Sequence, residues 1–108
     1  MNFILGLIAL YSATAVAAEM TCQIKLNLEP QLSATVVTHV NKKTAIGATK
    51  GIYAYVTEKE NNYFIVEAFL ADYEARIYGE GFLKQTSDRL TASIWSRENQ
   101  IELTCLKK

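Results

Sequence analysis

The last eight residues of the chain, 101–108, read IELTCLKK, and they decide how the predicted fold closes. Ile101, Leu103 and Cys105 alternate with Glu102 and Thr104, which is the period-two pattern of a strand with one buried face. This pattern directs the Cys105 sulfur toward the core. A buried cysteine this close to the end of the printed sequence suggests a partner elsewhere in the chain.

The stretch CQIKLNL, residues 22–28, shows the same alternation and carries the other of the two cysteines in the chain. Since both sulfurs point inward, we predict a Cys22–Cys105 disulfide that places the first and last strands together, as sheet neighbours or across a sandwich. A pair of buried free thiols is the alternative. Metal binding is not expected, because these cysteines and the single His39 do not form the four closely spaced ligands of structural zinc.

Residues 1–18, MNFILGLIALYSATAVAA, contain no charged side chain, whereas all 11 basic and all 11 acidic residues follow from Glu19 onward. An apolar segment followed by small residues is typical of a cleaved signal peptide. It is shorter than the roughly twenty apolar residues that span a bilayer. We therefore predict a signal peptide over 1–18, a single β domain over 19–108, and an exported protein, periplasmic or secreted. A retained membrane anchor is the alternative; after cleavage, no stable membrane insertion is expected.

The remaining pattern predicts an all-β fold, a small antiparallel sandwich or flattened barrel of about seven short strands. Residues 41–44 are predicted to form a polar turn. Residues 64–78 are predicted to form two strands joined by a turn near 71–73, with a short helix as the alternative because apolar residues also recur there at helical spacing. These short strands connected by polar turns show no internal domain boundary.

A hairpin is predicted from strands over 51–57 and 63–70, with residues 58–62 as a solvated tip. This loop length places Val56 beside Phe64 and Ala54 beside Val66 on an apolar face. The opposite face of the same hairpin then carries most of the aromatic side chains in this region, namely Tyr53, Tyr55, Tyr63 and Phe69, together with Ile65.

These aromatic residues are the candidate binding residues, because outward Tyr and Trp side chains mark binding surfaces when they cluster. Tyr53, Tyr55 and Tyr63 lead the set, and Trp95 joins it because Trp95 also lies opposite the apolar side of its strand. The alternative is that this face is covered by another layer or forms ordinary cross-strand pairs.

No standard catalytic or nucleotide-binding motif occurs in the chain, which lacks GxSxG, HExxH, P-loop and CxxC sequences. His39 has no second titrating partner in its strand, and Asp72 and Glu74 are expected in an exposed turn. We therefore predict neither an enzyme nor a cofactor. The formal net charge is zero, which disfavours a nucleic-acid partner, since such a partner requires a basic surface.

The overall plan resembles the small periplasmic inhibitors of C-type lysozyme: a signal peptide, a compact β-barrel, and one cysteine in the first strand and one at the end. The stretches TCQIKL, 21–26, and LTCLKK, 103–108, carry the resemblance. It implies an inhibitor that binds a protein. The Ser-Gly and Arg-Tyr loop of those inhibitors is absent here, and Trp95 precedes Ser96-Arg97-Glu98 where they have Trp-x-Lys-Gly, so no functional residue is carried over.

The expected function is thus that of an exported binding module that contacts a protein or a polysaccharide through its aromatic sheet face. A small-ligand carrier with a hollow barrel interior is the alternative from a different class. A solid core of Leu, Ile, Val and Phe side chains favours the first, because a barrel needs about eight strands before its interior opens.

Overall fold

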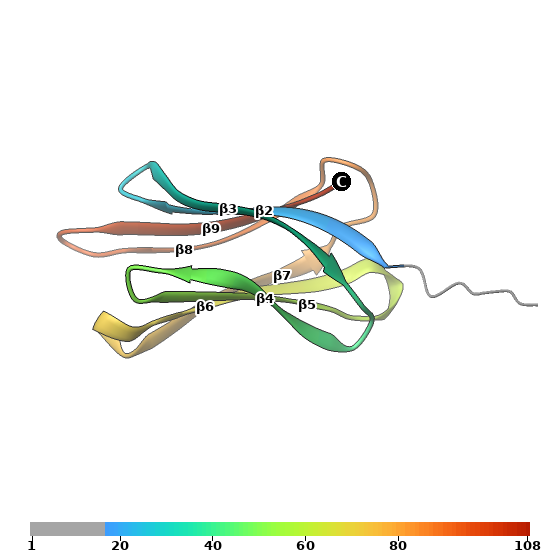
Figure 1. Ribbon diagram of the computed structural model, residues 1–108, viewed down its shortest axis with the longest axis horizontal. Helices are drawn as coiled ribbons and strands as arrows, with labels where there is room; N and C mark the ends of the chain where they lie inside the picture. Colours follow the sequence, from blue (N-terminus) through green and yellow to red (C-terminus); the bar gives the residue numbers. More distant parts are fainter. Residues whose placement is uncertain (1–16) are drawn as a thin grey trace, which may run out of the picture.

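The computed structural model describes residues 17–108 and shows an all-β protein made of two stacked four-stranded antiparallel sheets (Figure 1). The predicted sandwich is confirmed. The predicted signal peptide, residues 1–18, lies outside the described residues except for its last two positions. Within the described chain, no helix is long and apolar enough to cross a membrane.

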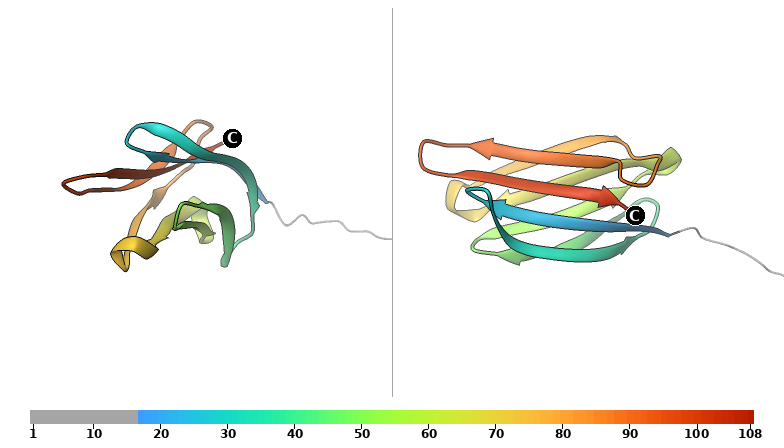
Figure 2. Two further views of the ribbon diagram at one scale, coloured as in Figure 1. Left: turned by 60° about the vertical axis from the view of Figure 1, so that its left-hand side comes forward. Right: turned by 90° about the horizontal axis from the view of Figure 1, so that it is seen from above.

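The first sheet has the strand order β3-β2-β9-β8, and its strands are β2 (Ala18–Leu26), β3 (Glu29–Thr38), β8 (Arg89–Trp95) and β9 (Gln100–Lys107). The second has the order β4-β5-β6-β7, and its strands are β4 (Lys42–Thr49), β5 (Ile52–Glu58), β6 (Tyr63–Leu70) and β7 (Ala75–Phe82). In the right-hand view of Figure 2, the four strands of the first sheet lie side by side in front of the second.

The Cys22–Cys105 disulfide is confirmed, with an S–S distance of 2.09 Å. It joins sheet neighbours, because β2 pairs directly with β9 and the two cysteines are opposite each other in the register. Both are fully buried. The last strand is therefore held at the centre of its sheet, between β2 and β8, by hydrogen bonds on both sides and by a covalent bond.

Residues 64–78 form strands and not a helix, so the helical alternative is wrong. Strand β6 ends at Leu70, the 3-10 turn η3 (Ala71–Tyr73) follows, and β7 begins at Ala75. Glu74 adopts a left-handed backbone conformation, with φ of 49°, which reverses the chain between the two strands. The turn predicted near 71–73 is confirmed.

The strand count differs from the prediction because residues 42–49 form an additional strand, β4. The predicted polar turn at 41–44 is wrong beyond Asn41, since Lys42 and Lys43 pair with β5. The apolar signal of this edge strand is weak: its register shifts between Ala45 and Gly47, and of its eight side chains only that of Ile46 is buried.

The β5–β6 hairpin has the predicted faces but a different register. Val56 pairs with Val66 and not with Phe64, which is a slip of two residues along the strand. A two-residue slip keeps every side chain on its predicted face, because the side-chain period of a strand is two. The hairpin is tighter than predicted because Glu58, expected at a solvated tip, belongs to β5 and pairs with Phe64.

Glu58 is buried, and its carboxylate is held by a buried hydroxyl. The Thr38 hydroxyl donates to Glu58 Oε1 at 2.7 Å, and Thr38 Oγ1 also lies 3.2 Å from the carbonyl oxygen of Ala18. Asn41 N–H donates to the Glu58 backbone carbonyl. A buried carboxylate requires a donor such as the Thr38 hydroxyl. The Thr38 and Asn41 hydrogen bonds together fasten the end of β3 to β5 in the second sheet.

The two sheets close against each other at both lateral edges, and glycine permits each approach. A Cβ atom on Gly79 of β7 would lie 2.7 Å from the backbone oxygen of Thr91 in β8. A Cβ atom on Gly47 of β4 would lie 2.8 Å from Leu32 Cδ2 in β3. The sandwich is therefore a flattened barrel in outline, as predicted, and large side chains such as Met20, Phe64 and Leu103 fill the space between its sheets.

Candidate binding surface

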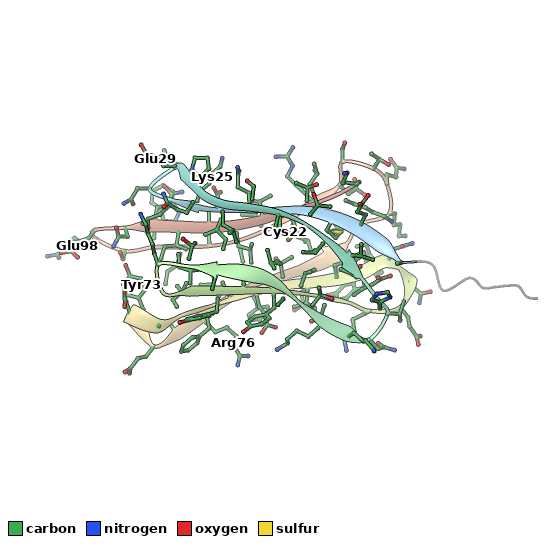
Figure 3. All side chains as sticks on the ribbon, viewed as in Figure 1. Cys22, Lys25, Glu29, Tyr73, Arg76 and Glu98 are labelled. Carbon is green, nitrogen blue, oxygen red and sulfur yellow. A yellow bond between two sulfur atoms is a disulfide. The ribbon has the colours of Figure 1, made fainter. Side chains whose placement is uncertain are left out.

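The two outer faces of the sandwich differ in chemistry. The first sheet exposes two isolated large apolar side chains, Val37 and Trp95. The rest of its outer face carries mainly hydroxyl and amide side chains, among them Thr21, Gln23, Ser33, Thr35, Thr91, Ser93 and Thr104. The second sheet presents large apolar and aromatic side chains, and we call this set the aromatic face: Tyr53, Tyr55, Tyr63, Ile65, Phe69, Tyr78 and Phe82. In Figure 3, Lys25 and Arg76 extend from these opposite outer faces.

The register of the second sheet places the aromatic residues in neighbouring rows. Tyr53 lies opposite Phe69, which lies opposite Arg76 on β7. In the next row, Tyr55 lies opposite Glu67, which lies opposite Tyr78. A further row pairs Tyr63 with Phe82. Strict alternation along β5, β6 and β7 thus gathers residues from three strands on one surface.

Much of this surface is open to solvent. Tyr53 and Phe69 are 43% and 44% exposed, and Phe82 and Tyr78 are 58% and 63% exposed. Within residues 17–108, therefore, no further layer covers the face. Some of the rings do contact each other across neighbouring strands: the Tyr53 and Phe69 ring centroids are 6.5 Å apart.

Charged groups stand among the rings and are mostly paired. Lys43 Nζ lies 3.2 Å from Glu67 Oε2 and 5.4 Å from the centre of the Tyr55 ring. The Tyr63 hydroxyl donates to Glu80 Oε1 at 2.8 Å, and this hydrogen bond, together with partial desolvation and the Glu80 charge, raises the pKa of Tyr63 above its ordinary value of 10.0. Tyr63 also packs edge-on against Phe82, with centroids 4.9 Å apart.

Three of the four predicted binding residues, Tyr53, Tyr55 and Tyr63, lie on the aromatic face. Trp95 does not, because it is on β8 in the other sheet, where it is 74% exposed. Tyr78 and Phe82 also lie on this face and are not among the predicted binding residues. Alternation along residues 75–82 directs Ile77 to the apolar side of the strand and Tyr78 to the other side. This alternation is the sequence feature that indicates an outward Tyr78.

The remaining candidates for chemistry lie apart from this surface. His39 is exposed in the β3–β4 connection, where its carbonyl accepts from Lys42 N–H at 3.1 Å. Asp72 and Glu74 are in an exposed turn, as expected. Among residues 17–108, no three His, Cys, Asp or Glu side chains are grouped so as to hold a metal ion.

A scan against protein-family models and searches of curated proteins and of solved structures found no match to this chain.

Proposed function

We propose that this protein is a small exported binding module that docks a partner protein on its aromatic face. The observation that carries the proposal is the contrast between the two outer sheet faces. An antiparallel sheet that faces water normally presents polar side chains, and the first sheet does so except at the isolated Val37 and Trp95. The second sheet departs from that rule over three adjacent strands, and a cluster of exposed apolar and aromatic side chains marks an interaction site.

The composition of the face fits a protein interface. Tyr, Phe and Arg are enriched at the centres of such interfaces, where rigid aromatic side chains provide contact area at a low entropic cost. Three strands of about eight residues give an outer surface of roughly 400 Å². A stable interface needs about 800 Å² from each partner, so the aromatic face supplies its centre and the adjoining loops the remainder.

The arrangement of the rings favours a protein over a polysaccharide. A polysaccharide chain stacks successive sugars on aromatic faces that lie in one plane. Here, the Tyr53 and Phe69 rings are tilted by 37° to each other, and the Tyr63 and Phe82 rings by 73°. Rings tilted in this way form an uneven surface, which can interdigitate with the side chains of a folded partner. The disulfide fits a protein of an oxidising compartment, so we expect the partner in the periplasm or outside the cell.

The test is recovery of a partner from the exported fraction of the source cells by immobilised protein. We compare the wild type, a double variant of the aromatic face (Tyr53→Ser with Tyr78→Ser), and Trp95→Ser as the matched control, which removes an exposed aromatic residue from the opposite sheet. We expect the wild type and the control to recover the same partner, and the double variant to bind it at least tenfold more weakly. All three should have the same stability within about 1 kcal/mol.

Equal recovery by all three proteins would refute the proposal, and so would unfolding of the double variant, which would make the face structural. Retention on an insoluble polysaccharide with no protein partner would point to the other binding class. Inhibition of C-type lysozyme by the wild type but not by the double variant would identify the partner as the one that the resemblance implies.

A further inference from the structure

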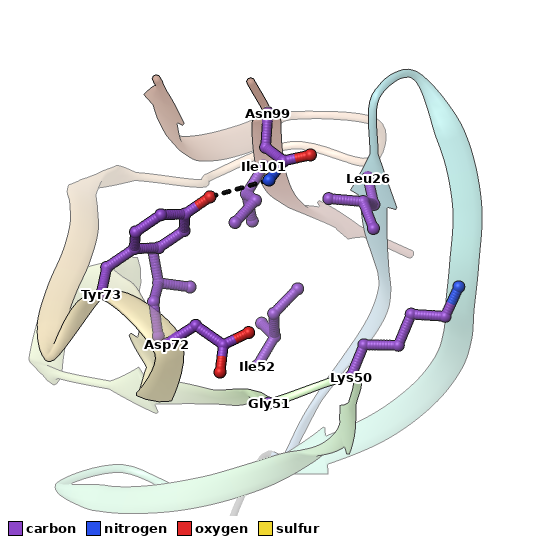
Figure 4. A pocket seen from close by; sticks show the side chains of 9 residues that line it. Leu26, Lys50, Gly51, Ile52, Asp72, Tyr73, Asn99 and Ile101 are labelled. Atoms are coloured by element: carbon purple, nitrogen blue, oxygen red, sulfur yellow. Dashed lines mark hydrogen bonds between the residues drawn. The ribbon is translucent and has the colours of Figure 1, made fainter. Parts of the chain in front are cut away.

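A second, unrelated site lies at one end of the sandwich, where four hairpin turns converge around a cavity of about 140 Å³ (Figure 4). The turns lie between β2 and β3, between β4 and β5, between β6 and β7, and between β8 and β9. The cavity is open to solvent on one side. Its lining combines an apolar floor with a polar rim, and none of its residues belongs to the aromatic face.

The floor consists of branched aliphatic side chains: Leu26, Ile52, Leu70 and Ile101. The last three are almost fully buried members of the core, so the floor of the cavity is the end of the core itself. A cavity of about 150 Å³ lined by such residues holds a molecule of the size of benzene. This space accordingly accommodates one small apolar group of four to six carbons.

The rim is held in place by hydrogen bonds between turns. Asn27 Nδ2 donates to Asn99 Oδ1, and Asn99 Nδ2 donates to the Tyr73 hydroxyl oxygen, both at 3.0 Å. The Ala71 N–H group donates to the Gly51 carbonyl at 2.9 Å. All four turns are therefore fixed relative to the cavity, which is formed before any ligand enters.

Two opposite charges stand at the opening without pairing with each other. The Asp72 side chain points into the cavity from the β6–β7 turn, whereas the exposed Lys50 side chain extends outward from the β4–β5 turn on the other side, so its ammonium group reaches a ligand after a change of rotamer (Figure 4). In the described part of the chain, neither takes part in an ion pair. A ligand that satisfies the site therefore needs a cation for Asp72, an anion for Lys50, and an apolar group for the floor.

We propose that this cavity binds a free amino acid with a branched apolar side chain, such as leucine. Its side chain contacts the aliphatic floor, its ammonium group pairs with Asp72, and its carboxylate pairs with Lys50. Because both ion pairs remain near solvent and a single side chain is buried, the expected dissociation constant is on the order of 1 mM.

An ammonium group or a carboxylate beside an apolar side chain also occurs at the two ends of a peptide. Capped forms of leucine distinguish a free amino acid from a peptide end. Leucinamide keeps the ammonium group and represents a peptide N-terminus; N-acetylleucine keeps the carboxylate and represents a C-terminus. We would titrate each compound into the ¹⁵N-labelled protein and follow the amide resonances of Gly51, Asp72 and Asn99. Leucine should bind about two- to fivefold more tightly than either capped form, since each cap removes one exposed ion pair.

Variants test the two charged groups separately. Asp72→Asn should weaken leucine binding two- to fivefold while leaving the affinity for N-acetylleucine unchanged, and Lys50→Asn should weaken leucine while leaving leucinamide unchanged. Asparagine suits position 50 because the backbone there is left-handed, with φ of 50°. Glu98→Gln is the matched control: it removes an exposed carboxylate from the β8–β9 turn that does not line the cavity, and it should change nothing.

The absence of shifts at these amides with 20 mM leucine would refute the proposal. Equal affinity for all three compounds would also refute it, because the charges would then play no part. Tighter binding of either capped form than of leucine would replace the free amino acid with a peptide end.

Discussion

Reduction of the Cys22–Cys105 disulfide should remove a large fraction of the stability of this domain. The two cysteines are 83 residues apart in sequence, so the bond closes nearly the whole described chain into one loop. In the chain-entropy model, opening a loop of this length costs about 4–5 kcal/mol of unfolding free energy. A domain of this size has only about 5–15 kcal/mol in total.

The assay is equilibrium unfolding in urea, with the oxidised and the reduced wild type compared in the same buffer. Reduction keeps the sulfur atoms in the core, so the difference reports the cross-link and not a cavity. With a slope of about 1–3 kcal/mol per molar urea, a loss of about 4–5 kcal/mol should lower the midpoint by roughly 1.5–5 M. The double variant Cys22→Ala with Cys105→Ala is the control and should not respond to reductant. A loss below about 1 kcal/mol on reduction would refute the reasoning.

Three further substitutions test separate contacts. Gly79→Ala should lower the unfolding free energy by about 1–3 kcal/mol, since the new Cβ would meet a backbone oxygen of β8 at 2.7 Å; thermal unfolding of the variant without such a loss would contradict the close approach. Thr38→Val should cost about 1–3 kcal/mol, because it removes the hydroxyl that donates to the buried Glu58 carboxylate, while Thr38→Ser should cost far less in the same denaturation assay. Glu80→Gln should lower the pKa of Tyr63 toward its ordinary value, so that this tyrosine ionises at a lower pH in an NMR titration; an unchanged titration would show that Glu80 does not hold its hydroxyl.

Much of the fold follows from local patterns that survive in the structure. Period-two alternation assigned the faces of most strands, and the two inward cysteines predicted the contact between the first and last strands. The pattern did not predict β4, because this strand contains two lysines, a glycine and small residues, and only one of its side chains, that of Ile46, is buried. Pairing with β5 stabilises the strand without an alternating apolar face. The hairpin register was wrong because Glu58 was expected in a loop, and its burial depends on Thr38, twenty residues away.

The candidate surface was predictable only within a hairpin. Alternation placed Tyr53, Tyr55 and Tyr63 on one side of β5 and β6, because that information is local. Whether a strand joins the same sheet is set by tertiary packing, which the pattern does not contain. For this reason Trp95 was grouped with residues of the other sheet, and Tyr78 and Phe82 of β7 were not assigned.

The central claim, that the aromatic face binds the partner, is tested most directly by site-specific photo-crosslinking. A photoreactive phenylalanine derivative replaces Tyr78 on the aromatic face in one protein and Trp95 on the opposite sheet in another. Both positions hold exposed aromatic residues in the native chain. After irradiation in the exported fraction, we expect a discrete protein adduct from position 78 and none from position 95. An adduct from position 95 alone would contradict the assignment of the binding face.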